Sequence, residues 1–169
     1  NRAKLEAIAR ARGVPWTTDL DQALGDDRYT IYFDAQSTDR RAAAVRRAIA
    51  AGRHVYCEKP SAATVAEALE LYELARDAGV CHGVVQDKLW LPGIVALREL
   101  MESGYFGRLL SVRGEFGYWV FEGDEVAPQR PSWNYRAEEG GGIIADMFAH
   151  WRYVLDEVFG RVVAVSCLG

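Results

Sequence analysis

The sequence predicts an α/β fold in which a partial, doubly wound parallel sheet is followed by the start of an α+β domain with an open-faced antiparallel sheet. Up to about residue 106, short apolar segments alternate with helical segments, which is typical of a parallel sheet covered by helices. After residue 107, single apolar and polar residues alternate instead, which indicates a strand with one buried face. We therefore predict two domains, residues 1–106 and residues 107–169.

Capping and turn residues delimit the elements of the first part. Asp19 can cap a short helix, and Pro92 suits the first turn of another. Gly52 stands where a left-handed residue ends a helix, while Thr64 and Glu67 have the spacing of a capping box. The predicted elements are helices at 3–12, after 19, at 39–51, from 64 to 79 and at 92–104, with strands at 30–33, 54–57 and 80–86.

The second part begins with a long alternating segment. Its apolar positions are Leu110, Val112, Phe116, Tyr118 and Val120, with polar residues between most of them. A polar loop at 122–139 leads to three glycines and a strongly apolar helix that ends near Phe159, and a last strand is predicted at 161–167.

Composition excludes several classes of protein. Hydrophobic residues make up 50% of the 169 residues and charged residues 26%, so the chain should bury a core. A net charge of -4 without a basic stripe argues against nucleic-acid binding, and no apolar segment is long enough to cross a bilayer. The three cysteines are isolated and lack metal-site spacing, which favours a reducing compartment and hence the cytoplasm.

Lys59 is the first candidate catalytic residue, because it follows the predicted strand at 54–57. In doubly wound sheets, ligands bind beyond the carboxyl ends of the strands. A lysine there can donate a proton to a substrate hydroxyl or polarise it, and Pro60 disfavours a helical conformation at Lys59. On these residues alone, an ordinary surface lysine in a turn is slightly favoured.

Asp146 and His150 form the second candidate site, since a spacing of four places them on one face of a helix. The helix is otherwise apolar, so a buried carboxylate and imidazole need partners or a cavity. Such a pair can tune the imidazole for proton transfer. A structural polar pair is the alternative. A metal site ranks lowest, because the other histidines fall on separate strands and further ligands are lacking.

Three consecutive glycines, Gly140, Gly141 and Gly142, precede that helix. They allow close approach of the backbone to a ligand, but they do not form a dinucleotide-binding glycine motif. A flexible loop leading into a packed helix explains them equally well.

Taken together, these motifs resemble the glucose-fructose oxidoreductase / inositol dehydrogenase (Gfo/Idh/MocA) family. The resemblance rests on the stretch AGRHVYCEKP at 51–60, the capped helix that ends at Gly79, GYFG at 104–107 and GGGIIADMFAH at 140–150. It covers nearly the whole chain in the family's order. The resemblance implies a Rossmann domain followed by a larger open-faced antiparallel sheet. The chain is expected to begin after the glycine-rich loop and to end within the second domain.

The resemblance also implies an enzyme of carbohydrate metabolism that uses NAD or NADP. It would transfer a hydride between the nicotinamide and a hydroxyl of a sugar, inositol or related polyol. Lys59 and His150 would handle the hydroxyl proton, with Asp146 beside them. Glu58 and Pro60 would lie near the nicotinamide ribose, and the Lys59–Pro60 peptide bond is often cis in the family.

Other binding residues are expected where this sequence departs from the family. Gln36, Ser37 and Thr38 stand at the family's usual Thr-Pro-Asn position, and Arg41 stands where a histidine is frequent. The resemblance implies cofactor contacts at these four positions, although the residues themselves depart from the family's pattern. The expected substrate-binding residues are Gln86, Lys88, Trp133, Tyr135 and Arg136. Aromatic rings beside a charged donor suit a sugar, although they also suit an ordinary contact between domains.

Two other functions are compatible with the same scaffold. One is an NAD-using glycosidase that oxidises its sugar only transiently, and the other is a non-catalytic nucleotide-binding scaffold. Relatives commonly pair their open sheets, so a homo-oligomer, either a dimer or a tetramer, is expected through the second domain. A small-molecule sugar or polyol is the expected partner.

Overall fold

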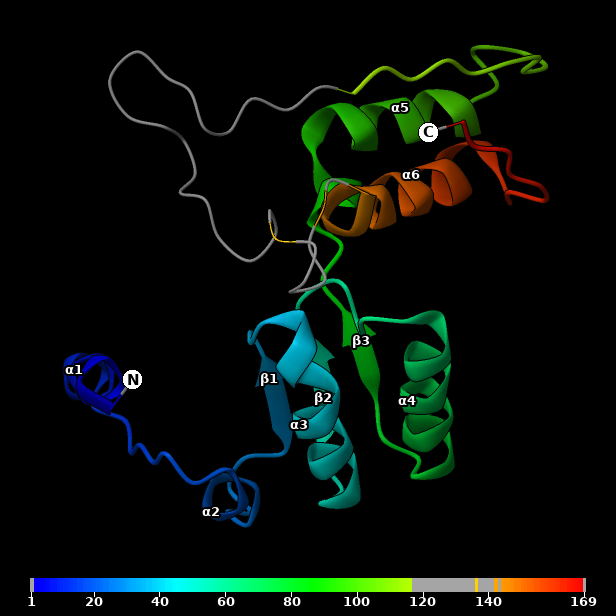
Figure 1. Ribbon diagram of the computed structural model, residues 1–169. Coiled ribbons are helices and arrows are strands. Elements are labelled where there is room, and N and C mark those ends of the chain that lie inside the picture. Colours follow the sequence, from blue (N-terminus) through cyan, green and yellow to red (C-terminus); the bar gives the residue numbers. More distant parts are fainter. Residues whose placement is uncertain (1, 117–135, 137–141, 143, 169) are drawn as a thin grey trace. The chain divides into compact units, whose positions relative to one another are not determined.

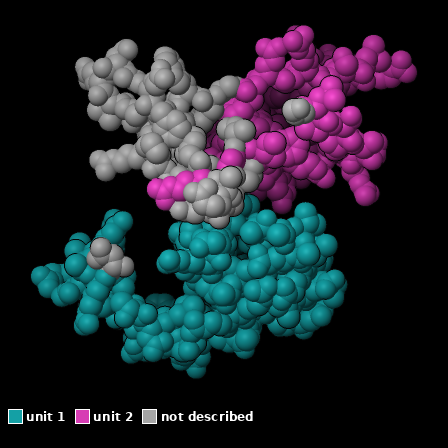
Figure 2. Space-filling view, viewed as in Figure 1, with its two compact units in different colours: residues 1–84 teal, residues 85–169 magenta. Residues whose placement is uncertain are grey.

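The computed structural model describes residues 2–116, 136, 142 and 144–168. The chain forms two compact units, residues 1–84 and residues 85–169 (Figure 2), and each is described by itself. The helices are α1 (Arg2–Arg12), α2 (Leu20–Leu24), α3 (Thr38–Ala50), α4 (Val65–Asp77), the 3₁₀ turn η1 (Asp87–Trp90), α5 (Pro92–Glu102), the π-helical turn η4 (Ile144–Phe148) and α6 (Ala149–Phe159); the strands are β1 (Ile31–Asp34), β2 (His54–Cys57) and β3 (His82–Val84).

The first unit contains a parallel sheet with the strand order β1-β2-β3 (Figure 1). Asp34 pairs with Cys57, and Cys57 pairs with Val84, so the three strands end in register. The segments that follow β1 and β2 therefore leave from the same edge of the sheet. The predicted parallel α/β fold is confirmed, and this edge is where such sheets bind ligands.

One face of the sheet packs against helices. α3 packs on β1 and β2 and lies beside α4 (Figure 1). Because side chains alternate along a strand, Val55 and Cys57 point into this core, while Phe33 and Tyr56 remain about half exposed on the opposite face. The core cluster consists of Leu24, Ala42, Val45, Ala48, Ile49, Val55, Ala62, Leu71, Ala75 and Val80.

The predicted capping signals are confirmed at Asp19 and Gly52, and half of the predicted capping box forms at Thr64. The Asp19 side chain accepts hydrogen bonds from the first backbone N–H groups of α2. Thr64 Oγ1 accepts the backbone N–H of Glu67 at 3.2 Å, but the Glu67 carboxylate accepts the N–H of Ala63 instead of Thr64. The Thr64 half of the capping box therefore forms as predicted, whereas the Glu67 carboxylate bonds to the residue before the expected one. Gly52 has φ +70°, the left-handed conformation expected of it.

In the second unit, α5 packs against α6, and η1 contacts both helices. The predicted apolar helix that ends at Phe159 is present, but its first turn differs from the expectation. Residues 144–148 form a π-helical turn before the α-helix begins at Ala149. Asp146 therefore lies in the wider turn and His150 in the α-helix.

The predicted strands of the second domain are wrong for the residues that the structure describes. Residues 110–116 and 161–167 have no strand, and large apolar side chains such as Leu110 and Val163 are exposed. A strand forms only where a neighbouring strand satisfies its backbone groups. The pairs found in the described residues, β1 with β2 and β2 with β3, leave no such partner for these segments. The predicted domain boundary at residue 107 stays a prediction.

Within the described residues, no helix has the length and apolar character needed to cross a bilayer.

Candidate active site

The loop after β2 carries the Glu-Lys-Pro sequence at the carboxyl edge of the sheet. The Glu58 N–H donates to the backbone oxygen of Asp34 at 2.8 Å, which extends the contact between β1 and β2 beyond the last paired residues. The Lys59–Pro60 peptide bond is cis, as expected from the family resemblance. Glu58, Lys59 and Pro60 are all partly buried. The predicted catalytic lysine therefore lies in a loop with a defined path, at the edge where ligands bind.

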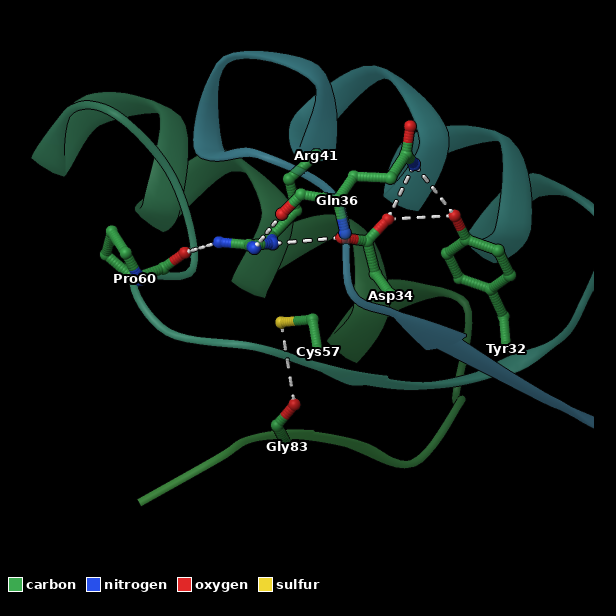
Figure 3. A network of polar contacts seen from close by, with 7 residues as sticks. All are labelled: Tyr32, Asp34, Gln36, Arg41, Cys57, Pro60 and Gly83. Atoms are coloured by element: carbon green, nitrogen blue, oxygen red, sulfur yellow. Dashed lines mark hydrogen bonds and ion pairs between the residues drawn. The ribbon is translucent and has the colours of Figure 1, made fainter. Parts of the chain in front are cut away.

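A buried ion pair lies beneath this edge (Figure 3). Arg41 Nε donates to Asp34 Oδ1 at 3.0 Å, and the two side chains are 1% and 0% exposed. The same guanidinium also donates to the backbone oxygens of Gln36 and Pro60. Arg41 on α3 therefore connects the end of β1, the loop that follows β1 and the loop that follows β2.

The Asp34 carboxylate is the centre of this polar network. It accepts hydrogen bonds from the Tyr32 hydroxyl at 2.8 Å and from the Gln36 side chain at 2.8 Å. Burial alone would raise the pKa of Asp34, but hydrogen bonds from Gln36, Tyr32 and Arg41 together lower it below its ordinary value. Burial and the hydrogen bond to Asp34 raise the pKa of Tyr32 to about 12. At neutral pH the network thus holds an ionised Asp34 and a neutral Tyr32.

The four residues expected to contact a cofactor lie in different environments. Gln36 is exposed and Ser37 partly buried, so both are accessible at the edge of the sheet. Thr38 is 2% exposed, and its hydroxyl has no hydrogen-bond partner in the described part of the chain. Arg41 is 1% exposed and holds the two loops in place. Direct contacts of these residues with a cofactor stay predictions.

A second polar cluster surrounds His150 within the second unit. His150 is 3% exposed, and its Nδ1 lies 3.0 Å from Gln86 Oε1 and 3.7 Å from Asp87 Oδ1. Lys88 Nζ lies 2.8 Å from the other Asp87 oxygen, Oδ2. The hydrogen bond from Lys88 lowers the pKa of Asp87, and the charges of Lys88 and His150 act in the same direction. The apolar helix α6 thus presents its buried imidazole to the polar residues at η1.

The other predicted site residues differ in burial, and two of them lie outside the described part of the chain. Asp146 is partly buried in η4, one turn before His150, and Arg136 is exposed. Trp133 and Tyr135 lie outside the described residues. Gln86, expected to face the substrate, contacts the candidate catalytic histidine, and its contact with a substrate stays a prediction.

Sequence reasoning missed Asp87. Asp87 could have been selected from the sequence, because it is a carboxylate between Gln86 and Lys88, two predicted substrate-binding residues. Only the packing of η1 against α6 shows that this carboxylate faces the imidazole of His150. No group of three residues suited to hold a metal ion occurs in the described part of the chain.

Both parts of the chain match known family models. Residues 1–86 match the oxidoreductase family with an NAD-binding Rossmann fold, and residues 94–169 match the GFO/IDH/MocA C-terminal domain. The chain belongs to the GFO/IDH/MocA family of oxidoreductases. The family expected from the sequence motifs is therefore confirmed.

Several relatives are similar over most of the chain. The D-xylose dehydrogenase of Paenarthrobacter nicotinovorans is 54% identical over 167 residues, which is 98% of this chain and 43% of that protein. The structure of levoglucosan dehydrogenase in complex with NADH and levoglucosan has a TM-score of 0.80 and 25% identity, covering 95% of this chain and 43% of that one. An NAD-binding oxidoreductase from Klebsiella pneumoniae has a TM-score of 0.77 and 28% identity, covering 95% and 42%. The chain thus spans 43% of the length of its 54%-identical relative.

The match also confirms the expected class of cofactor, a nicotinamide dinucleotide. The residues of the sheet edge fit such a group, because Gln36, Glu58 and Lys59 supply amide, carboxylate and ammonium groups where the strands end. The network around Arg41 fixes the backbone of the loops that carry them.

Proposed function

We propose that the full-length protein is an NAD(P)-dependent dehydrogenase that oxidises a hydroxyl group of a sugar, inositol or related polyol. The observation that carries the proposal is the 54% identity with a D-xylose dehydrogenase, which extends over 98% of this chain and includes both candidate sites. D-xylose and related pentoses are therefore the first substrates to test.

The chemistry needs a destination for one proton. Oxidation of a CH–OH group to a carbonyl removes a hydride from carbon and a proton from oxygen, and the bound nicotinamide supplies the hydride acceptor. His150 suits the role of base, because a neutral imidazole accepts protons near pH 7. The Lys59 ammonium, in a loop at the edge of the sheet, can stabilise the negative charge that develops on the hydroxyl oxygen. Asp146 is expected to act beside them.

Recognition of the sugar is assigned to the polar and aromatic residues predicted from the sequence. These are Gln86, Lys88, Trp133, Tyr135 and Arg136. Their role follows from the match between aromatic rings beside charged donors and the faces and hydroxyls of a sugar. A cytoplasmic location and self-association through the second domain complete the proposal.

The test is turnover by the full-length protein. Nicotinamide absorbance is followed with NAD or NADP across pentoses, hexoses, anhydrosugars and inositols, beginning with D-xylose. Lys59→Ala and His150→Ala should each lower turnover by about 10²–10⁴-fold. His82→Ala is the matched control, because His82 is exposed and lies at the amino end of β3, whereas Lys59 follows the carboxyl end of β2.

Three results would contradict the proposal. Full turnover in Lys59→Ala and His150→Ala would show that neither side chain takes part in the reaction. Cofactor binding with no turnover on any substrate would favour a scaffold. Release of an aglycone from glycosides, with no net change in reduced cofactor, would favour an NAD-using glycosidase.

A further inference from the structure

The contacts of His150 Nδ1 indicate which ring nitrogen carries the proton of the neutral imidazole. A neutral imidazole carries its proton on either Nδ1 or Nε2, and the other nitrogen is then the base. His150 Nδ1 faces two side-chain oxygens, Gln86 Oε1 at 3.0 Å and Asp87 Oδ1 at 3.7 Å. The ring is 3% exposed, so these neighbours replace water at Nδ1.

The carboxylate settles the orientation of the amide. An ionised carboxylate only accepts hydrogen bonds, and Asp87 is held ionised by Lys88 at 2.8 Å. If the Gln86 amide donated to Nδ1, the nitrogen lone pair would face the Asp87 carboxylate, which is unfavourable. With the proton on Nδ1, the N–H donates to Gln86 Oε1 and the nearby negative charge stabilises it.

From this geometry we propose that Gln86 and Asp87 keep the proton of neutral His150 on Nδ1, which leaves Nε2 as the nitrogen that accepts the substrate proton. Gln86 and Asp87 are thus positioning residues. The second half of the statement rests on the proposed dehydrogenase function. The first half concerns the folded protein alone.

The distances assign different roles to the two residues. Gln86 Oε1 lies 3.0 Å from His150 Nδ1 and is a hydrogen-bond partner of the ring. Asp87 Oδ1 lies 3.7 Å from the same nitrogen, which is too long for a hydrogen bond, so Asp87 acts on the ring through its charge. Lys88 offsets part of the Asp87 charge. A neutral amide as the direct partner orients the ring through a hydrogen bond and adds no second negative charge beside it.

The chain contains an internal comparison in His54. The backbone N–H of Cys81 donates to His54 Nδ1 at 3.1 Å. Because a backbone N–H only donates, Nδ1 of His54 is the acceptor and its proton lies on Nε2. His54 and His150 should therefore be opposite tautomers in one protein.

Nuclear magnetic resonance of the imidazole nitrogens tests the proposal directly. The full-length protein is labelled at histidine, and the signals of its three histidines are assigned with one substitution at each. At a pH where the rings are neutral, we expect the proton on Nδ1 of His150 and on Nε2 of His54. A proton on Nε2 of His150 would overturn the proposal.

Two substitutions of Gln86 add a test of cause. Gln86→Leu removes the acceptor, so the Nδ1–H population of His150 should fall and kcat should drop more than KM changes. Gln86→Glu keeps an acceptor oxygen and should retain the Nδ1–H tautomer. An unchanged His54 signal shows that each variant is folded. An unchanged His150 tautomer in folded Gln86→Leu would overturn the role of Gln86.

The outcomes separate this proposal from the proposed function. An Nδ1–H tautomer in a protein that turns over no sugar would support the geometry and contradict the dehydrogenase. An Nε2–H tautomer in a protein whose turnover depends on His150 would do the reverse.

Discussion

Replacing Arg41 by Met should destabilise the first unit strongly. The substitution removes the guanidinium that pairs with Asp34 and donates to the backbone oxygens of Gln36 and Pro60. Because the Asp34 side chain is 0% exposed, water cannot replace the lost partner. Breaking a buried ion pair on one side costs about 3–5 kcal/mol, which is a large part of the roughly 5–15 kcal/mol that stabilises a typical protein.

Denaturant unfolding of the full-length protein measures the loss, with all samples free of cofactor because a ligand would add stability. Arg46→Met is the matched control. Arg46 also lies on α3 and pairs with Glu70 at 2.6 Å, but both of those side chains are considerably exposed. Its loss should be much smaller, since exposed ion pairs contribute little. The double variant Asp34→Asn/Arg41→Met should be more stable than Arg41→Met, because no unpaired charge stays buried. Equal losses in Arg41→Met and Arg46→Met would refute the reasoning.

Two further predictions concern stability. The pKa of Tyr32 is raised from 10.0 to about 12 in the folded protein, so its contribution to stability is present below pH 10 and is lost as the pH rises from 10 through 12. In Tyr32→Phe, the fall in unfolding free energy over this range should be smaller, and an identical fall would contradict the assignment. Gly52→Ala should cost about 1–2 kcal/mol, since φ is +70°, even though no atom lies within 4 Å of the added Cβ. The control Gly93→Ala, in helix α5 with equally free space and no positive φ, should instead stabilise by about 0.5–1 kcal/mol. Thermal or denaturant unfolding compares the two, and equal effects would contradict the backbone argument.

The parallel part of the fold could be predicted because its signals are local. Short apolar segments mark β1 and β2, while Asp19, Thr64 and Gly52 mark helix ends through contacts within a few residues. Such contacts depend little on the rest of the molecule. The cis bond before Pro60 is different, because it was expected from the family resemblance and not from any local pattern.

The strands predicted for residues 110–116 and 161–167 failed for a physical reason. Alternation shows that a segment could bury one face, but a strand also needs a partner for its backbone groups. That partner is decided by long-range pairing, which the pattern of a single segment does not contain.

The site was only partly predictable. The sequence motifs selected Lys59, Asp146 and His150 as candidates. The sequence did not show that Arg41 is buried against Asp34, nor that Gln86 and Asp87 face the imidazole. These contacts depend on side chains that are distant in sequence, so they appear only once the helices have packed.

Isotope transfer is the most direct test of the central claim, that the protein moves a hydride from a sugar carbon to a nicotinamide. The full-length protein is incubated with NAD or NADP and with D-xylose in which every carbon-bound hydrogen is replaced by deuterium. The reduced cofactor is then examined by mass spectrometry. The account predicts deuterium in the reduced nicotinamide for the wild type and for His82→Ala, with transfer slowed by about 10²–10⁴-fold in Lys59→Ala and His150→Ala. Reduced cofactor without deuterium, or transfer at the wild-type rate in both variants, would contradict it.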